Sequence, residues 1–370
     1  MYKVKPRILK KIINKHYDTK TPLFIRGGFG IGKSAISKEV AKEIAKRKGK
    51  EYLEWNNLPK KQKHEIFKQP EKYFIMFDER LSQYEPSDLR GLPMFDKSKN
   101  DSVIWKIPLW LEYTTLPNSD GFIFFDEINN APPSILKACY QIYLDKQICE
   151  YKVNENFLVL GAGNRIEDKA DIFDIPQPLL DRQSEVEMVI DDEEWFNWAF
   201  KNNIDSRIIT FLKFRPDYLL KIDNNKDVKS TTPRGWERVS NLIKGEEDED
   251  IEDFVSVAIS EGVALEFLAF LKLQRKVDIE AIIKNPKKIK EITEIDLKCS
   301  AIGGFVAYYQ KDVKHFEGIV KISNELEEEF GILLLRLLLG TKPKHFKSNV
   351  IKLDVWKNEL SQKFIKFLID

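Results

Sequence analysis

A glycine-rich run, Gly27-Gly28-Phe29-Gly30-Ile31-Gly32-Lys33-Ser34, constrains the fold of this chain more than any other feature. It fits the pattern G-x-x-x-x-G-K-[ST] and lies between an apolar run at residues 23–26 and a helical pattern at residues 34–48. Glycines in this context let the backbone turn its N–H groups toward phosphates, and the helix N-terminus adds positive charge. We therefore predict a P-loop, in preference to a glycine-rich turn that carries Gly-Lys-Ser by accident.

The residues of this run have separate expected roles in binding the phosphates of ATP. Lys33 is expected to reach the β- and γ-phosphates, and the Ser34 hydroxyl is expected to ligate Mg²⁺. The other predicted nucleotide contacts are Gly27, Gly28, Phe29, Gly30, Ile31, Gly32 and Ala35.

A pair of acids, Asp126 and Glu127, directly follows an apolar run at residues 122–125. A buried strand that ends in an acid is what a P-loop site needs to hold the magnesium shell, and we assign that role to Asp126. Glu127 would orient and deprotonate the water that attacks the γ-phosphate. Acids at strand ends are common and are frequently just solvated, so the position downstream of the P-loop is what favours the functional interpretation.

Short apolar runs alternate with helical patterns over the first half of the chain. The runs lie at residues 23–26, 73–77, 122–125, 157–160 and 186–190, and helical patterns lie at 34–48 and 133–144. Several runs are apolar throughout, which is typical of parallel strands covered on both faces. The alternation predicts an α/β fold, a three-layer P-loop NTPase core with a parallel sheet.

The second half of the chain shows helical patterns instead. They lie at residues 194–200, 208–214, 234–243, 254–273 and 355–368, and an acidic run at 245–250 predicts an exposed loop or a helix start. We predict an ATPase core at residues 1–190, a helical lid at residues 191–275 and a helical C-terminal extension at residues 276–370.

The charges of the chain nearly cancel, because 60 Lys and Arg face 59 Asp and Glu. This balance argues against a protein that mainly coats nucleic acid or an anionic membrane. The three cysteines form no CxxC pair, which fits a reducing cytosol. No export signal and no apolar stretch long enough to cross a bilayer stands out. We expect a cytoplasmic protein that does not bind membranes.

The two phosphate-site motifs resemble those of AAA+ ATPases, and the residues around them resemble the MoxR family of the helix-2-insert clade. The matching stretches are residues 78–83, 85–93, 126–133, 161–165, 178–182 and 232–236, which follow one another in the right order and spacing. The resemblance covers about residues 20–243, and the rest of the C-terminal part lies outside it.

The resemblance implies roles for three further residues. Asn164 stands where relatives carry the sensor 1 residue that helps to hold the water, although it could instead cap a turn. Arg182 stands where relatives carry an arginine finger for the neighbouring subunit, but Gln183 replaces the usual Phe and Arg165 competes for the role. Arg234 stands where the sensor 2 arginine contacts the nucleotide from the lid, and a solvent-facing helical arginine is the alternative.

Two insertions also resemble elements of this clade. Residues 82–119 form a long connection with a β-element at residues 103–110, and residues 146–157 are expected to form a hairpin with its turn at residues 154–156. In similar proteins such loops face the central pore of a ring and grip substrate. Trp105 and Trp110 would grip substrate or pack the insertion onto the core.

The resemblance implies an ATPase that uses ATP and Mg²⁺ and forms a homo-oligomeric ring, with six subunits as the family expectation. Such a ring would remodel a protein client, with a separate von Willebrand factor A domain protein as partner. A nucleic-acid-translocating motor is one alternative, but the lysines at 97, 99 and 106 are offset by acids at 96, 101 and 112. A nucleotide-gated binding scaffold is the other, and Glu127 argues against it.

Overall fold

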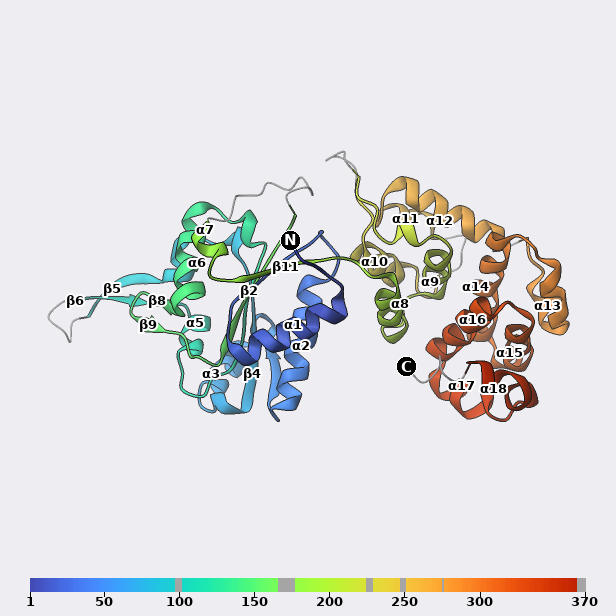
Figure 1. The fold of residues 1–370 in the computed structure, drawn as a ribbon, viewed down its shortest axis with the longest axis horizontal. Helices are drawn as coiled ribbons and strands as arrows, with labels where there is room; N and C mark the ends of the chain where they lie inside the picture. The colour runs from blue at the N-terminus through green and yellow to red at the C-terminus, as the bar shows by residue number, and fades with distance from the viewer. Residues whose placement is uncertain (97–101, 166–176, 224–228, 247–250, 275, 365–370) are drawn as a thin grey trace. The chain divides into compact units, whose positions relative to one another are not determined.

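The fold is described from a computed structural model of the chain (Figure 1). The described residues are 1–96, 102–165, 177–223, 229–246, 251–274 and 276–364. They belong to two compact units, Met1–Asp191 and Asp192–Asp370, and each unit is described by itself. The charges at positions 97, 99 and 101, most of the acidic run and the end of the last predicted helix lie outside the described residues.

The first unit is built on a seven-stranded sheet in the order β1-β11-β2-β10-β7-β4-β3, in which every pairing is parallel. The strands are β1 (Lys3–Val4), β2 (Leu23–Arg26), β3 (Glu51–Glu54), β4 (Tyr73–Arg80), β7 (Gly121–Asp126), β10 (Phe157–Gly163) and β11 (Ser184–Met188). The five predicted strands form the centre of the sheet. The two edge strands, β1 and β3, were not predicted from the sequence, because β1 has only two residues and β3 buries none of its side chains fully.

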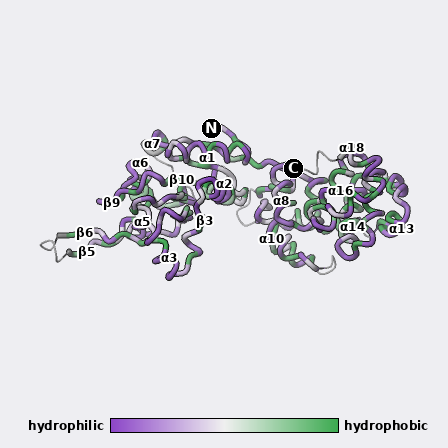
Figure 2. The backbone as a smooth tube through the Cα atoms, turned by 90° about the horizontal axis from the view of Figure 1, so that it is seen from below, coloured by the Kyte–Doolittle hydropathy of each residue, from purple (hydrophilic) through white to green (hydrophobic). Residues whose placement is uncertain are grey.

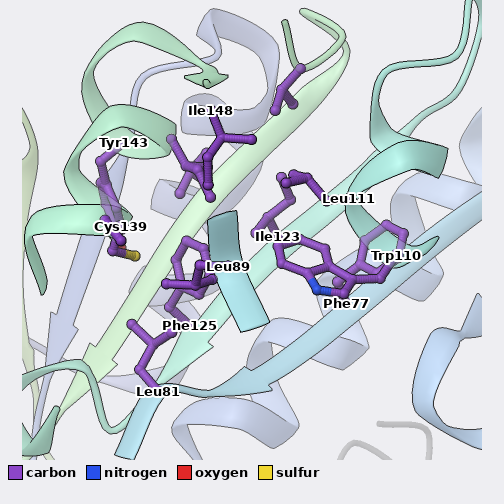
Figure 3. Close-up of a cluster of buried hydrophobic side chains, with 14 of the residues drawn as sticks. Phe77, Leu81, Leu89, Trp110, Leu111, Ile123, Phe125, Cys139, Tyr143 and Ile148 are labelled. Carbon is purple, nitrogen blue, oxygen red and sulfur yellow. The ribbon is translucent and has the colours of Figure 1, made fainter. Parts of the chain in front are cut away.

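Helices cover both faces of this sheet (Figure 1). One face carries α1 (Pro6–Thr19) and α2 (Lys33–Arg47), where Tyr17 packs against Phe74 and Phe122. The other face carries α5 (Leu109–Thr114) and α6 (Pro133–Asp145), and Figure 3 shows part of its core. The short helices are α3 (Lys60–Ile66), α4 (Pro86–Arg90) and α7 (Gln177–Leu180). The predicted three-layer α/β core with a P-loop after its β2 strand is confirmed.

Two antiparallel hairpins occupy the predicted insertions. One pairs β5 (Leu92–Asp96) with β6 (Ser102–Lys106), and the other pairs β8 (Gln147–Ile148) with β9 (Tyr151–Lys152). The predicted turn at residues 154–156 is wrong for this second hairpin, which turns at Cys149 and Glu150 instead. A two-residue loop favours left-handed backbone, and Cys149 has φ 48°. Residues 154–156 form a separate turn that leads into β10.

Helices dominate the described part of the second unit, which also holds an isolated bridge between Lys221 and Thr231. They are α8 (Asp192–Lys201), α9 (Ser206–Phe214), α10 (Pro233–Ile243), α11 (Glu252–Ser256), α12 (Glu261–Gln274), α13 (Ile279–Lys284), α14 (Ile295–Lys311), α15 (Phe316–Glu325), α16 (Glu328–Thr341), α17 (Pro343–Val350) and α18 (Ser361–Phe364). Because α14 packs against α9, α12 and α16, helices before and after residue 275 share one unit. A lid boundary at residue 275 stays a prediction.

The helix predicted at residues 254–273 is two helices, α11 and α12. Between them the helical hydrogen bonding is interrupted: the backbone N–H of Ser260, directly before α12, donates to the Thr231 hydroxyl (3.1 Å) rather than to a carbonyl one turn earlier. Within the described ranges, every helix falls short of the length or the apolar character that a bilayer crossing requires.

Asp120 joins several elements at the amino ends of the strands, on the side of the sheet away from the P-loop. Its side chain is fully buried just before β7 and accepts hydrogen bonds from Tyr17 (2.7 Å), Lys48 and Lys50 (2.9 Å). Burial alone would raise the pKa of Asp120, but the hydrogen bonds from Lys48, Lys50 and Tyr17 outweigh it and hold that pKa below its usual value. The carboxylate therefore ties α1 and the end of α2 to the sheet.

We expect Asp120→Asn to lower the free energy of unfolding by about 2 kcal/mol, because each hydrogen bond to a charged group contributes about 1.5–3 kcal/mol. A carboxylate with a depressed folded pKa loses its contribution as the pH falls through that pKa, so the deficit should persist at neutral pH and shrink below about pH 4. Urea denaturation of both proteins across this pH range measures the deficit. Equal stabilities at neutral pH would contradict the role given to Asp120.

Candidate functional site

The P-loop lies between β2 and α2, at the carboxyl edge of the parallel strands, which is where such sheets bind ligands. The Gly27 N–H donates to the carbonyl of Gly163 at the end of β10 (3.2 Å), which anchors the start of the loop. Gly32 has φ 102° directly before α2, a left-handed conformation that a side chain would strain. The predicted nucleotide contacts, from Gly27 to Ala35, thus lead into the first turn of α2.

The Lys33 side chain is folded into this loop. Its Nζ donates to the carbonyl oxygens of Gly27 (2.7 Å) and Gly28 (2.9 Å), and it lies 3.4 Å from Oδ1 of Asn164. Asn164 follows β10 directly, next to β2 in the sheet. The structure therefore brings the predicted lysine and the predicted sensor 1 amide to one place.

Ser34 and Asp126 meet at the end of β7. The Ser34 hydroxyl donates to Oδ2 of Asp126 (3.1 Å). Burial raises the pKa of the Asp126 carboxyl, and the charge of Asp78 raises it further. A hydroxyl beside a carboxylate suits Mg²⁺, which prefers oxygen ligands and takes few of them from protein when phosphates and waters supply the rest. Within the described residues, no three His, Cys, Asp or Glu side chains converge into a metal site of their own.

Glu127 stands beside this pair in an unusual backbone conformation. Its φ is 54°, and its N–H donates to Oδ1 of Asp126 (3.0 Å). The Ser82 hydroxyl, from the segment after β4, donates to Oε2 of Glu127 (2.8 Å). Sequence reasoning placed Ser82 in the matching stretch 78–83 but gave it no role, because the sequence does not show that this segment reaches Glu127. The contact fixes where the Glu127 carboxylate lies.

Asn129 is a second residue that sequence reasoning did not single out. It is fully buried, and its side-chain amide makes two hydrogen bonds to the backbone of Asn164: Nδ2 donates to the carbonyl (2.8 Å), and Oδ1 accepts from the N–H (3.1 Å). A Cβ at Gly163 would lie 2.5 Å from Oδ1 of Asn129, so this close approach requires glycine. The sequence offered one indication of this role, because Asn129 is a polar residue only two positions after Glu127.

The three arginines lie in different settings. Arg165 pairs with Glu187 of β11 (3.5 Å), and its Nη2 would lie 3.0 Å from a Cβ placed on Gly28, so it sits against the P-loop of its own chain. Arg182 is exposed in a turn just before β11. Arg234 is exposed in the first turn of α10, in the second unit, so its position relative to the P-loop is not described.

We expect Asn129→Ala to lower the free energy of unfolding by about 1–3 kcal/mol, because two backbone groups of Asn164 lose their partners. Hydrogen exchange should increase most at the end of β10, because the backbone N–H of Asn164 loses its acceptor. Amide hydrogen exchange of a peptide covering residues 157–165 measures the release. Asn130→Ala is the matched control, and equal exchange in the two variants would contradict the clamp.

Comparisons with known proteins add little to this geometry. No family model and no curated protein matches the chain. Among solved structures, NtrX from Brucella abortus in complex with ADP aligns at 12% identity over 98% of this chain and 68% of its own, with a TM-score of 0.35. A RuvB mutant from Thermotoga maritima aligns at 12% identity over 79% of this chain and 86% of its own, with a TM-score of 0.34. Likeness at these TM-scores carries no argument about function.

Proposed function

We propose that this chain is a magnesium-dependent ATPase of the AAA+ class, related to the MoxR family, that works as a ring and remodels a protein partner. One observation carries the proposal. Lys33 lies within hydrogen-bonding reach of Asn164 and the adjacent Ser34 within reach of Asp126, with Glu127 directly beside Asp126. That set can bind a terminal phosphate, hold a metal and activate a water.

The proposed chemistry is hydrolysis of the γ-phosphate of ATP. The loop N–H groups and Lys33 would bind the phosphates, so Lys33 must leave the carbonyls of Gly27 and Gly28 when ATP enters. Ser34 and Asp126 would hold Mg²⁺, which when bound would neutralise charge on the β- and γ-phosphates. Glu127 would take the proton of the attacking water, and Asn164 would help to hold that water.

An arginine from a neighbouring subunit would complete the site, and we assign that role to Arg182. Its side chain is exposed, as a group that reaches another subunit must be. Arg165 is the weaker candidate, because Glu187 and the P-loop of its own chain hold it. A guanidinium delivered to the γ-phosphate stabilises the charge of the transition state and would make hydrolysis depend on assembly. Arg234 would contact the nucleotide from the lid.

The β5–β6 ribbon favours a protein as the partner. The side chains of Leu92, Met94, Phe95 and Val103 are all exposed on it. Figure 2, which colours the backbone by hydropathy, marks hydrophobic residues along this ribbon. A two-stranded ribbon is marginally stable alone, and here the Tyr151 hydroxyl ties its base by donating to the Trp105 carbonyl (2.7 Å). Exposed apolar side chains suit contact with protein, whereas a nucleic-acid channel needs cations, and Lys106 is the one cation among the described side chains of the ribbon.

The two tryptophans of this insertion lie in different settings. Trp110 is buried against Phe77 in the core under α5, with ring centroids 5.7 Å apart (Figure 3), so it packs the insertion. Trp105 is half-buried at the base of the ribbon, close to the second hairpin. We therefore assign the outer part of the β5–β6 ribbon, from Trp105 toward Asp96 and Ser102, to contact with the client or with a von Willebrand factor A domain partner.

We expect Glu127→Gln to reduce ATP turnover by about 10²–10⁴-fold, because the attacking water loses its base. Binding of ATP should persist, so a ring with trapped nucleotide should accumulate. Phosphate release and size-exclusion chromatography measure the two effects. Glu155→Gln, which makes the same change in an exposed loop at the opposite edge of the sheet, is the matched control.

Three outcomes would change the proposal. Equal turnover in the Glu127→Gln and Glu155→Gln variants would mean that another residue is the base. Strong stimulation of wild-type turnover by single-stranded DNA would favour the nucleic-acid motor. Tight ATP binding by a wild-type protein that hydrolyses nothing at any concentration would favour the binding scaffold.

A further inference from the structure

Asp78 lies on β4, the strand beside the predicted metal ligand. The parallel pairing of β4 with β7 sets Asp78 opposite Phe124 and Arg80 opposite Asp126. Side chains alternate along a strand, so Asp78 and Asp126 point to the same face of the sheet, two residue pairs apart in register. This is the face that α2 covers, because Lys38 of α2 forms an ion pair with Asp78.

Helix α2 contacts the two acids with residues one turn apart. Ser34 donates to Asp126 (3.1 Å), and Lys38 lies 2.9 Å from Oδ2 of Asp78. Positions four apart on a helix share a face, so the two contacts lie side by side. Asp78 is therefore a second carboxylate next to the pair that we assign to Mg²⁺.

The ion pair with Lys38 uses Oδ2 of Asp78 and leaves the other carboxylate oxygen, Oδ1, to be explained. Lys38 also binds Glu54 (3.1 Å), so it has a partner besides Asp78. Oδ1 of Asp78 is buried and has no hydrogen-bond donor among the described residues. A buried carboxylate oxygen without a donor is unfavourable, and nearly all such atoms in native proteins find one. A donor from outside the chain would satisfy it.

We propose that Asp78 is a positioning residue for the metal, whose Oδ1 accepts a hydrogen bond from a water bound to Mg²⁺. Mg²⁺ keeps several of its waters in protein sites, and the groups that hold such waters strengthen metal binding. The Asp78 charge also attracts the cation to the Ser34–Asp126 pair. This inference rests on the proposed function, because it takes that pair as the metal site.

The test uses Mn²⁺ as the metal and ADP as the nucleotide, with the full-length wild type and three variants. Free Mn²⁺ is measured by electron paramagnetic resonance in the presence of ADP, and ADP binding without metal is measured in EDTA. Asp78→Asn removes the charge and keeps the shape. Glu54→Gln removes the other carboxylate from Lys38, and Lys38→Met removes the lysine while leaving Asp78 in place. Asp78→Ser repeats the test if the Asn variant loses ADP binding in EDTA.

We expect Asp78→Asn to weaken Mn²⁺ binding by about tenfold or more, because residues that hold metal-bound groups typically contribute 10–100-fold in affinity. Glu54→Gln should bind Mn²⁺ as the wild type does, and Lys38→Met should bind it equally or more tightly, since the negative charge is retained. Binding of ADP in EDTA should be unchanged in all variants.

Two results would overturn this inference while the proposed function stands. One is wild-type Mn²⁺ affinity in the Asp78→Asn variant. The other is an equal loss of affinity in Asp78→Asn and Lys38→Met, which would show that Asp78 serves only to hold Lys38. A wild-type protein that binds neither ADP nor Mn²⁺ with ADP would instead overturn the proposed function, and the inference with it.

Discussion

The hydrogen bond between Ser34 and Asp126 joins the two halves of the candidate site. Ser34 begins α2 directly after the P-loop, and Asp126 ends β7, a strand that lies two places from β2 in the sheet. Their 3.1 Å contact requires that the loop and the carboxyl end of β7 lie on the same side of the sheet, and the loop reaches across the end of β10, which lies between the two strands. Parallel strand direction meets the first condition, because all carboxyl ends then share one edge.

The residues around this contact fix the neighbouring groups in turn. Asn129 holds the backbone of Asn164, and the Gly163 carbonyl holds the Gly27 N–H, so the end of β10 is tied to both motifs. Ser82 holds Glu127 from the β4 side. At the opposite edge, Asp120 joins α1 and the end of α2 to the sheet, which fixes the far end of the helix that carries Lys33 and Ser34.

The sequence allowed the centre of this arrangement to be predicted, and physical reasons explain what it did not reveal. Apolar runs marked the five central strands because those strands are buried on both faces, whereas β1 and β3 at the edges lack such runs. The P-loop and Asp126 could be predicted because each belongs to a short local motif whose residues have a known physical role: a glycine-rich loop that binds phosphates, and an acid at the end of a buried strand. Ser82, Asn129 and Asp78 lie in stretches that match the family, but their roles depend on contacts between segments far apart in the chain, which the local sequence does not show. The hairpin turn was misplaced because Asn154 and Asn156 favour turns, yet they lead into β10.

The central claim is that one site gathers backbone N–H groups, a lysine, a hydroxyl and a carboxylate around the phosphates of ATP. Equilibrium titration with a fluorescent ATP analogue, with Mg²⁺ and with EDTA, tests it most directly. We predict that the wild type binds more tightly with Mg²⁺. Lys33→Ala should bind at least about tenfold more weakly, because a hydrogen bond to a charged group contributes about 1.5–3 kcal/mol. Lys46→Ala, on the exposed face of α2, should bind as the wild type does. Equal affinities of the Lys33→Ala variant and the wild type would contradict the account.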